Sequence, residues 1–270
     1  MPELPEVESV VRTLKDGIPT LCGLRIVSVN AVWKGIFSDD PCCLDEALLV
    51  GCRFRSITRQ GKYLLFNLEC PDRRSRVLII HLRMTGRLFL VPQGAAVERH
   101  TRLVLMLEHD LALRFDDPRK FGRVWLVDDP MTVIGGLGPD ALSVNFSDFA
   151  GRLASHRRQL KPLLLDQTCV AGIGNIYADE SLFRAGLHPL AIASALTPDD
   201  LRRLHAAVIS VLEEAVEAQG ANIDGVFKAG RFVVSVYGRE GAPCRICGRA
   251  ISKIRVGQRG THFCRQCQVL

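Results

Sequence analysis

The sequence contains no hydrophobic run long enough to cross a membrane. A membrane-spanning helix needs about 20 consecutive apolar residues, whereas the longest apolar runs here, such as 77–80, have the length of a strand. The N-terminus carries glutamates in place of the basic start and apolar stretch of a signal peptide. We therefore expect a cytoplasmic protein with no membrane partner. We also expect its ten cysteines to be reduced thiols more often than disulfides.

The last part of the chain has few acidic residues. Residues 223–270 carry nine Lys and Arg against two acids, Asp224 and Glu240, while the whole chain has a net charge of +6. Residues 1–222 are therefore close to neutral. A basic tail can be merely a solvated face, but this concentration of positive charge favours a polyanion such as nucleic acid as the partner.

The first residues, Met1–Glu6, place a proline next to a carboxylic acid at the N-terminus. If Met1 is removed, Pro2 presents a secondary amine, and an N-terminal amine loses its proton roughly two pH units below a lysine. An unprotonated amine can attack an aldehyde-level carbon, and Glu3 could move protons beside it. A proline here can also simply stiffen the chain, and these six residues alone favour that interpretation.

Changes in periodicity divide the chain. Apolar residues recur with helical spacing from Pro5 to Gly17. Strand-sized runs separated by Gly, Pro and Asp clusters follow as far as Val127, a pattern typical of an antiparallel sandwich. Helical patterns then span 160–165 and 175–185, and a third begins with a capping box at Thr197. The expected strands span 25–29, 63–68, 77–82, 87–91, 102–107 and 123–127.

These patterns predict a multidomain α+β fold. Residues 1–134 would form an antiparallel β-sandwich with a leading helix, and the glycines near 135–138 would begin a linker over 135–145. Residues 146–231 would form a helical domain, and 232–270 a small, basic, cysteine-rich module.

Two Cys-x-x-Cys pairs in the last module have the spacing of a zinc site. Cys244 and Cys247 form the first pair, and Cys264 and Cys267 form the second, with sixteen residues between the pairs. Four thiolates leave no open position for water, so a bound Zn²⁺ would be structural. Two disulfides are the alternative, and the expected reducing compartment disfavours them.

Other motifs each allow two interpretations. The glycines and asparagine of 172–175 precede a helix and could bind a phosphate, but they could also be a simple helix-entry turn. The turn 117–122 carries Arg119 and Phe121, which suit insertion into stacked bases, or it is a solvated hairpin. Lys62 and Arg259 each stand at a glycine turn and alone would be surface charges.

Taken together, the segments resemble the formamidopyrimidine-DNA glycosylase family, bacterial repair enzymes with an N-terminal proline nucleophile. Eight collinear segments carry the resemblance across nearly the whole chain, which excludes chance convergence. They are MPELPEVE at 1–8, GKYLL at 61–65, HLRMTG at 81–86, DPRKFG at 117–122, GLGPDALS at 136–143, KPLLLD at 161–166, GIGNIYADESLF at 172–183, and the zinc finger ending in CRQC at 264–267.

The resemblance implies a β-sandwich catalytic domain, a helix-two-turns-helix domain and a zinc finger that together bind damaged double-stranded DNA, with no organic cofactor and as a monomer. A base inside the stack is out of reach, so it is turned out into a pocket. Pro2 would attack C1′ of the sugar and form a Schiff base, with Glu3 as the acid/base. Lys62 would assist base recognition and β-elimination, and Arg259 would bind phosphates and assist δ-elimination.

The resemblance also implies a set of DNA contacts. Three side chains would fill the gap left by the everted base, three would form a phosphate clamp, and others would contact DNA elsewhere. The gap-filling residues are Met84, Arg119 and Phe121; the clamp is His81, Lys62 and Asn175; the other contacts are His100, Arg119 and the pair His156 and Arg157. The family usually has lysine or arginine at the last site, which leaves open which member of that pair makes the contact.

One departure bears on the substrate. The segment between Gly220 and Tyr237 looks shorter than the loop that closes over 8-oxoguanine in many relatives, so preference could move toward ring-opened formamidopyrimidines or hydantoins. Two alternatives remain: a relative similar to endonuclease VIII, which removes oxidised pyrimidines, and a damaged-DNA-binding zinc protein without catalysis. The Pro-Glu-Leu-Pro start favours the purine branch, and intact Pro2 and Glu3 favour an enzyme.

Overall fold

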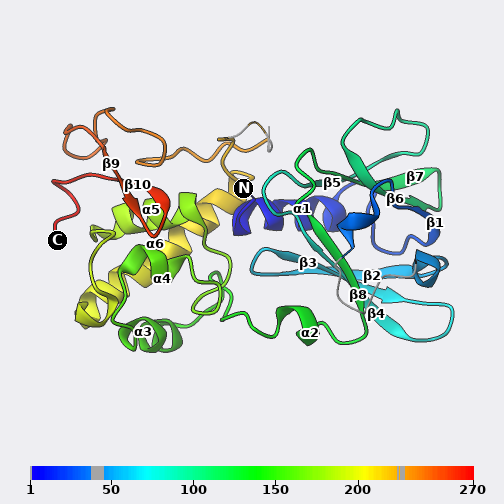
Figure 1. Ribbon diagram of the computed structural model, residues 1–270, viewed down its shortest axis with the longest axis horizontal. Coiled ribbons are helices and arrows are strands. Elements are labelled where there is room, and N and C mark those ends of the chain that lie inside the picture. Colours follow the sequence, from blue (N-terminus) through cyan, green and yellow to red (C-terminus); the bar gives the residue numbers. More distant parts are fainter. Residues whose placement is uncertain (1, 38–45, 224, 226–228) are drawn as a thin grey trace. The chain divides into compact units, whose positions relative to one another are not determined.

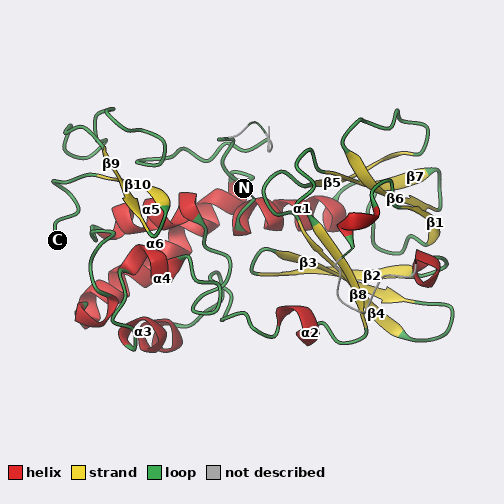
Figure 2. Ribbon diagram, viewed as in Figure 1, coloured by secondary structure: helices red, strands yellow, loops and turns green. Residues whose placement is uncertain are grey.

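The computed structural model describes residues 2–37, 46–223, 225 and 229–270 of the chain, which group into two compact units. Unit 1 contains Pro2, residues 6–136 and residue 225; unit 2 contains residues 3–5, 137–223 and 229–270. Figure 1 follows the chain through both units, and Figure 2 shows that unit 1 holds most of the strands and unit 2 most of the helices.

Helix α1 (Leu4–Asp16) opens the chain, as its apolar spacing predicts. Val7, Val11 and Leu14 are buried along one face. The helix ends where expected, with the Gly17 N–H donating to the Thr13 carbonyl at 3.1 Å. Burial of this face fixes the helix and thereby the direction in which the N-terminal residues leave it.

Unit 1 contains two four-stranded antiparallel sheets, which confirms the predicted β-rich N-terminal domain. The first sheet, in spatial order, consists of β1 (Ile26–Asn30), β6 (Thr101–Leu107), β7 (Leu111–Asp116) and β5 (Arg87–Pro92). The second consists of β2 (Arg53–Gln60), β3 (Tyr63–Glu69), β4 (Ser75–His81) and β8 (Arg123–Val127). The short elements are η1 (Lys34–Ile36), η2 (Glu46–Leu49) and α2 (Met131–Ile134).

Strands β2 and β7 are absent from the strands expected above because charged residues interrupt their apolar pattern. In β7, Arg114 is only 3% exposed, yet its guanidinium donates to the carbonyls of Ala95 at 2.5 Å and Ala96 at 2.6 Å. These two hydrogen bonds offset part of the cost of burying the guanidinium in a strand interior.

The expectation of free thiols is wrong for one pair of cysteines. Cys52 precedes β2 and Cys70 follows β3, and the pairing of Arg53 with Glu69 in the β2–β3 ladder brings the two cysteines face to face, where they form a disulfide. Cys22 and Cys169 are free thiols, as expected, and Cys169 is buried. The remaining two cysteines outside the predicted zinc site, Cys42 and Cys43, lie outside the described residues.

Unit 2 is mainly helical and ends in a two-stranded hairpin. Its helices are α3 (Phe146–Ala154), α4 (Leu160–Leu164), α5 (Asn175–Ala185), η3 (Ala193–Ala195) and α6 (Pro198–Glu217), and its strands are β9 (Ser252–Val256) and β10 (Arg259–Phe263). The predicted capping box at the start of α6 is present: the Thr197 hydroxyl accepts the Asp200 N–H, and the Asp200 carboxylate accepts the Thr197 N–H.

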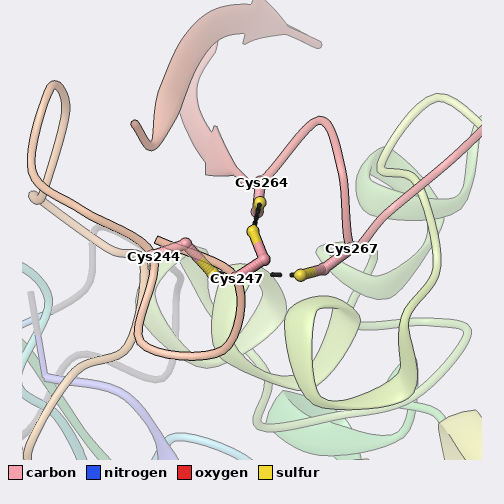
Figure 3. Close-up of side chains that lie close together, drawn as sticks. All are labelled: Cys244, Cys247, Cys264 and Cys267. Atoms are coloured by element: carbon pink, nitrogen blue, oxygen red, sulfur yellow. Dashed lines mark hydrogen bonds between the residues drawn. The ribbon is translucent and has the colours of Figure 1, made fainter. Parts of the chain in front are cut away.

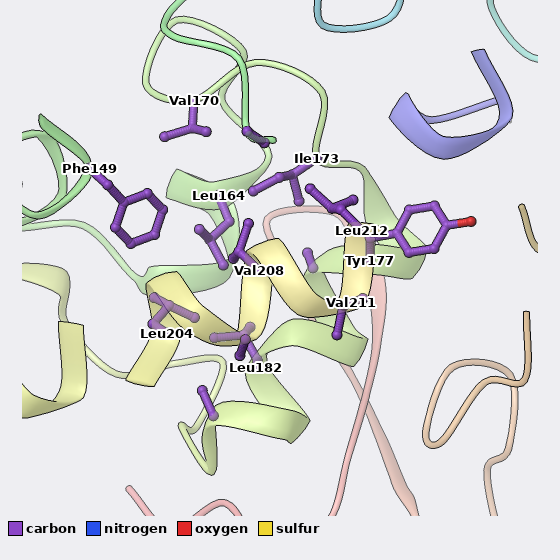
Figure 4. Packing of buried hydrophobic residues seen from close by; sticks show 14 of the residues in the cluster. Phe149, Leu164, Val170, Ile173, Tyr177, Leu182, Leu204, Val208, Val211 and Leu212 are labelled. Atoms are coloured by element: carbon purple, nitrogen blue, oxygen red, sulfur yellow. The ribbon is translucent and has the colours of Figure 1, made fainter. Parts of the chain in front are cut away.

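The core of unit 2 forms between α5, α6 and the helices beside them. Figure 4 shows Tyr177 and Leu182 of α5 against Val208 and Leu212 of α6, all buried. The apolar residues that recur with helical spacing along α6 are all buried: Leu201, Leu204, Val208, Val211, Leu212 and Ala215. The core therefore holds α5 rigidly, and the N-terminus of α5 contributes to the site described next. Among the described residues, no helix combines the length and apolar character that a membrane span requires.

Candidate active site and zinc centre

The carboxylate of Glu3 binds the N-terminus of helix α5. Its Oε1 accepts the Ile176 N–H at 2.9 Å and its Oε2 accepts the Tyr177 N–H at 3.3 Å. Glu3 is 1% exposed. Two N–H donors and the positive end of the helix dipole stabilise the negative charge of this carboxylate. Because Pro2 is bonded to Glu3, the same contacts restrain the residue predicted to be the nucleophile.

The glycines before α5 make room for the N-terminal residues. A Cβ on Gly174 would lie 2.2 Å from the Glu3 carboxyl carbon, and one on Gly172, whose φ is +110°, would lie 2.4 Å from the Leu4 side chain. The Leu4 N–H also donates to the Gly172 carbonyl at 3.1 Å. The prediction that these glycines admit a phosphate is therefore corrected: the anion at this helix terminus is the chain's own Glu3.

Asn175, predicted to contact a phosphate, lies at the first position of α5 and reaches the zinc-finger hairpin. Its Nδ2 donates to the Gly260 carbonyl at 3.2 Å and to the Tyr237 hydroxyl at 3.4 Å. Asn175 thus joins the helix that holds Glu3 to the strand that begins with Arg259.

Arg259 lies at the tip of the predicted hairpin. Gly257 and Gln258, with φ values of +53° and +63°, form a two-residue turn of the type favoured in hairpins, and Val256 pairs with Arg259 beyond it. Arg259 is exposed, so its guanidinium is accessible to a phosphate.

A buried ion pair fixes this hairpin on α5. Lys161 Nζ lies 2.6 Å from Asp179 Oδ1, both side chains are fully buried, and the same Nζ donates to the Gly260 carbonyl at 3.0 Å. Asp179 Oδ2 accepts the His262 N–H at 2.8 Å. Burial lowers the pKa of Lys161, and the Asp179 carboxylate opposes that shift.

Glu180, the next residue of α5, fixes the segment that leads into the zinc finger. Its buried carboxylate accepts the N–H groups of Ser235, Val236 and Tyr237 at 2.7 to 2.9 Å. The sequence motifs include Lys161, Asp179 and Glu180 but indicate no role for them. The sequence feature that could have indicated buried, paired charges is the presence of two adjacent acidic residues and a lysine within otherwise apolar helical segments.

The four predicted metal ligands converge on one point (Figure 3). The sulfurs of Cys244, Cys247, Cys264 and Cys267 all lie within 4.8 Å of one another, with 3.9 Å from Cys244 to Cys267 and 3.4 Å from Cys247 to Cys264. Sulfurs bound tetrahedrally at about 2.3 Å from a zinc ion lie about 3.8 Å apart. The cluster therefore fits one structural Zn²⁺, and Phe183 of α5 packs against it.

In unit 1, Lys62 lies in the two-residue turn between β2 and β3. Gly61 precedes it with φ +56°, a value that suits the first position of such a hairpin turn, and Gln60 pairs with Tyr63 around the two residues. Lys62 is only 7% exposed, and its charge acts on the nearby His81 at the end of β4.

His81 is buried as a neutral imidazole. Burial, followed by the charges of Arg83 and Lys62, lowers its pKa to about 3. Its Nδ1 accepts the Arg83 N–H at 3.0 Å, and its ring stacks edge-on against Tyr63 at 4.6 Å. With Nδ1 as acceptor, the proton of the neutral ring lies on Nε2, which can donate a hydrogen bond to a phosphate without adding charge.

Three of the predicted DNA contacts lie on two exposed turns. Met84 is 36% exposed and Phe121 is 45% exposed, so both side chains reach the surface. The Arg119 guanidinium lies 4.8 Å from the centre of the Phe121 ring, so the two side chains form one cation–π pair. His100 is half-buried, and its ring lies 3.4 Å from the Arg102 guanidinium.

His156 and Arg157 follow helix α3 in unit 2. The His156 backbone is bound on both sides, by the Leu153 carbonyl and the Ser194 N–H, and its side chain is half-buried. The Arg157 side chain is exposed. Of the two side chains, that of Arg157 is the more exposed.

Comparison with known proteins identifies the class to which this combination of domains belongs. Residues 1–124 match the formamidopyrimidine-DNA glycosylase N-terminal domain, 137–225 the formamidopyrimidine-DNA glycosylase H2TH domain, and 241–269 the zinc finger found in FPG and IleRS. The fold and the cysteine cluster thus define a zinc-finger protein with an H2TH domain.

Full-length relatives then identify the family. Proteins named formamidopyrimidine-DNA glycosylase from Rippkaea orientalis (40% identity, 99% of this chain, all of the relative) and Desulfitobacterium hafniense (41% identity, all of both chains) match it. Among solved structures, Lactococcus lactis Fpg (MutM) with DNA containing N7-benzyl-Fapy-dG has a TM-score of 0.89 at 34% identity, and each chain is fully covered. The chain belongs to the formamidopyrimidine-DNA glycosylase family.

Proposed function

We propose that this protein excises oxidised purines from double-stranded DNA and cleaves the strand at the resulting site, with Pro2 as nucleophile. Family membership supports the activity, since the relatives carry the name formamidopyrimidine-DNA glycosylase. Structures of similar chains hold DNA with a formamidopyrimidine, an abasic site or a carbocyclic 8-oxo-G. The observation in this chain that carries the proposal is the Glu3 carboxylate held by two N–H groups of α5, beside Pro2.

The chemistry begins with proton transfer. Glu3 is held unprotonated and adjacent to Pro2, so it is placed to accept the proton that Pro2 must lose to become a nucleophile. The Pro2 nitrogen attacks C1′ of the sugar and forms a new C1′–N bond. The bond between C1′ and the nitrogen of the base breaks, and its electron pair leaves with the base. The remaining hydrogen of the Pro2 nitrogen is lost as a proton that neutralises the departed base. Glu3 returns its own proton to the ring oxygen as the sugar opens, and the nitrogen lone pair forms the C1′=N bond of the iminium.

The iminium then promotes strand cleavage. It withdraws electrons from C2′, whose proton is lost as the C3′–O bond breaks; the C5′–O bond breaks in the following δ-elimination. Both departing groups are phosphates. From the resemblance we assign Lys62 to base recognition and the β-elimination. We assign Arg259 to the phosphates and the δ-elimination, since hydrogen bonds from Lys161 and Asn175 to Gly260 hold the Arg259 turn on the helix that binds Glu3.

We assign DNA binding to side chains of both units. Met84, Arg119 and Phe121 would fill the gap left by the everted base, and their exposure suits that role. His81 and Asn175 would belong to the phosphate clamp with Lys62; Asn175 Nδ2 is already bound within the chain, so a phosphate must compete with Gly260. His100 and Arg157 would contact the DNA backbone farther from the everted base. We further infer that the enzyme acts as a monomer in the bacterial cytoplasm.

Borohydride trapping tests the proposal. The full-length chain, incubated with duplex DNA that carries an oxidised purine and with sodium borohydride, should form a covalent adduct that is absent from a Pro2→Gly variant. DNA binding without an adduct would support the non-catalytic alternative. A duplex with an oxidised pyrimidine serves as the second substrate, and faster release of that base would support the endonuclease VIII-like alternative.

Lesion preference needs a separate measurement. The segment between Gly220 and Tyr237 looks short in the sequence, and its residues 224 and 226–228 lie outside the described residues. We propose a preference for formamidopyrimidines and hydantoins over 8-oxoguanine. Single-turnover excision rates on duplexes that differ only in the lesion test it, and a strong preference for 8-oxoguanine would contradict it.

A further inference from the structure

The two exposed turns that carry Met84 and Arg119 share one buried carboxylate. Asp117, 1% exposed, follows β7 and opens the turn that contains Arg119. Its Oδ1 accepts the Thr85 hydroxyl, from the other turn, at 2.5 Å. Within its own turn, Oδ1 accepts the Arg119 N–H at 3.2 Å and Oδ2 accepts the Gly122 N–H at 2.7 Å.

The backbone of Asp117 extends the connection to a third segment. Its N–H donates to the His100 carbonyl at 2.8 Å, and its carbonyl accepts the Arg102 Nε–H at 2.8 Å. Asp117 is therefore bonded to three segments, and these bear all the predicted DNA contacts of unit 1 other than Lys62 and His81.

Packing reinforces the connection, because both turns end in a glycine that lies against the ring of Phe115. A Cβ on Gly86 would lie 2.8 Å from that ring, and one on Gly122 would lie 2.4 Å from it. Each turn also contains a residue in the left-handed region, Arg83 at φ +54° and Lys120 at φ +57°. Residues other than glycine rarely adopt this backbone conformation unless surrounding contacts hold them in it. The turns therefore depend on hydrogen bonds such as those of Asp117.

We propose that Asp117 and Thr85 are positioning residues that make Met84, Arg119 and Phe121 enter the DNA as one rigid wedge. Unstacking a base costs a few kcal/mol, and a wedge can supply this only if its parts do not move separately. This inference rests on the proposed function. It predicts that the Thr85–Asp117 bond matters for substrates whose base must be turned out and is dispensable for substrates that require no eversion.

The test compares two substrates in single-turnover experiments with the full-length protein. One is a duplex with an oxidised purine; the other is a single-stranded oligonucleotide with an abasic site, which has neither a base to evert nor a partner strand. Thr85→Val removes the hydroxyl and keeps the shape of the side chain. We expect it to slow duplex excision by about tenfold or more, since the lost hydrogen bond is to a charged group, and to leave single-stranded cleavage within about twofold. Thr85→Ser should restore the duplex rate.

The chain offers a matched control in Asp116, the residue before Asp117, which also binds a threonine hydroxyl. The Thr101 hydroxyl donates to Asp116 Oδ1 at 2.7 Å, also in a buried position, but neither residue lies in the two turns. Thr101→Val should therefore leave the ratio of the two rates at the wild-type value, whatever it does to stability. A Thr85→Val variant whose ratio equals that of wild type or of Thr101→Val would overturn the inference.

A second variant covers the case in which Thr85→Val fails to fold. Asp117→Asn keeps the size of the side chain and loses the charge, and it should change the rate ratio in the same direction; an unchanged ratio would contradict the inference. The proposed function fails separately: a wild-type chain that gives no borohydride-trapped adduct with either substrate would remove both conclusions. An active wild type with unaffected variants would remove only the inference about Asp117.

Discussion

At the residue scale, Glu3 is a structural cap of helix α5, and we assign the proton transfers to the same carboxylate. Its carboxylate accepts two N–H groups that α5 cannot satisfy within the helix, and the glycine at 174 leaves just enough room for it. No residue adjacent to α5 in sequence provides this cap. A role in proton transfer therefore requires no movement of Glu3 away from a helix that the core of unit 2 holds in place.

We expect Glu3→Gln to lower the rate of base excision by about 10² to 10⁴-fold, the range for removal of a general acid/base. The amide cannot accept and return a proton, although it keeps the length of the side chain. Glu8→Gln is the control, because Glu8 is a carboxylate of helix α1, which follows Glu3, and it pairs with Arg59 at 2.9 Å. Single-turnover excision measures both variants; comparable rates for the two would remove Glu3 from the chemistry.

His81 should make stability depend on pH. Its pKa in the folded protein, about 3, lies well below the ordinary value of 6.5, so the unfolded chain binds a proton in the window between them and the folded chain does not. The free energy of unfolding therefore falls as pH falls through that window and is largest above it. Between pH 7 and pH 5 the loss from this residue should be about 2 kcal/mol.

Denaturant unfolding of wild type and His81→Gln at both pH values measures this effect. Glutamine does not titrate, so the variant should lose about 2 kcal/mol less than wild type between pH 7 and pH 5. Equal losses in the two proteins would show that His81 does not remain neutral on folding.

At the scale of elements, regular periodicity made much of the fold predictable. Helices α1 and α5 lie within one residue of their expected bounds, and α6 begins at its predicted capping box, because each has an apolar stripe with a start or stop signal. Helix α3 has the Asn145 cap, whose side chain accepts the Asp148 N–H, but it is too short for its stripe to be distinctive. Strands β2 and β7 have arginines within their apolar alternation.

The candidate site was predictable where its residues are neighbours in sequence. Pro2 with Glu3, and each Cys-x-x-Cys pair, carry their chemistry in local spacing. The supporting residues escaped prediction because their partners are distant in sequence: Lys161 is 99 residues from the carbonyl that it binds, and Thr85 is 32 residues from Asp117. Only folding brings such groups together, and the sequence alone gives no measure of their separation.

Lys161→Met tests the tie between α4, α5 and the zinc-finger hairpin. The change leaves the Asp179 carboxylate buried without its cation, so we expect a loss of about 3–5 kcal/mol in the free energy of unfolding. Lys253→Met is the control: Lys253 pairs with Glu240 on the surface, both about half exposed, and should contribute at most about 1 kcal/mol. Chemical denaturation measures both, and similar small losses would show that the buried pair is not important for stability.

At the scale of the whole molecule, the zinc finger should depend on its metal to fold. Cys264→Ser removes one of four ligands, and we expect the zinc content to fall well below one ion per chain and DNA binding to be lost, while the sheets of unit 1 remain folded. Cys22→Ser, outside the cluster, is the control. Metal analysis, circular dichroism and a DNA-binding assay test this; undiminished DNA affinity would contradict a structural role for zinc.

DNA binding should weaken steeply with salt, since phosphate contacts release counterions. If six or more phosphates are bound, affinity should fall by about 10³-fold or more between 50 and 200 mM salt. Arg157→Ala should reduce the slope of log Kd against log salt by about one if this side chain contacts a phosphate. Fluorescence anisotropy at several salt concentrations measures the slope, and an affinity that hardly changes with salt would argue against phosphate-dominated binding.

The disulfide between Cys52 and Cys70 requires oxidising conditions, whereas the four clustered cysteines of the same chain require reducing conditions. A reductant that protects the four clustered sulfurs from oxidation also acts to open this bridge at the end of the β2–β3 hairpin, whereas exposure to air preserves the bridge and favours oxidation of the cluster. Samples handled differently would therefore be different covalent species of the same sequence. Counting the accessible thiols of each sample before a measurement would show whether the Cys52–Cys70 disulfide is intact or reduced.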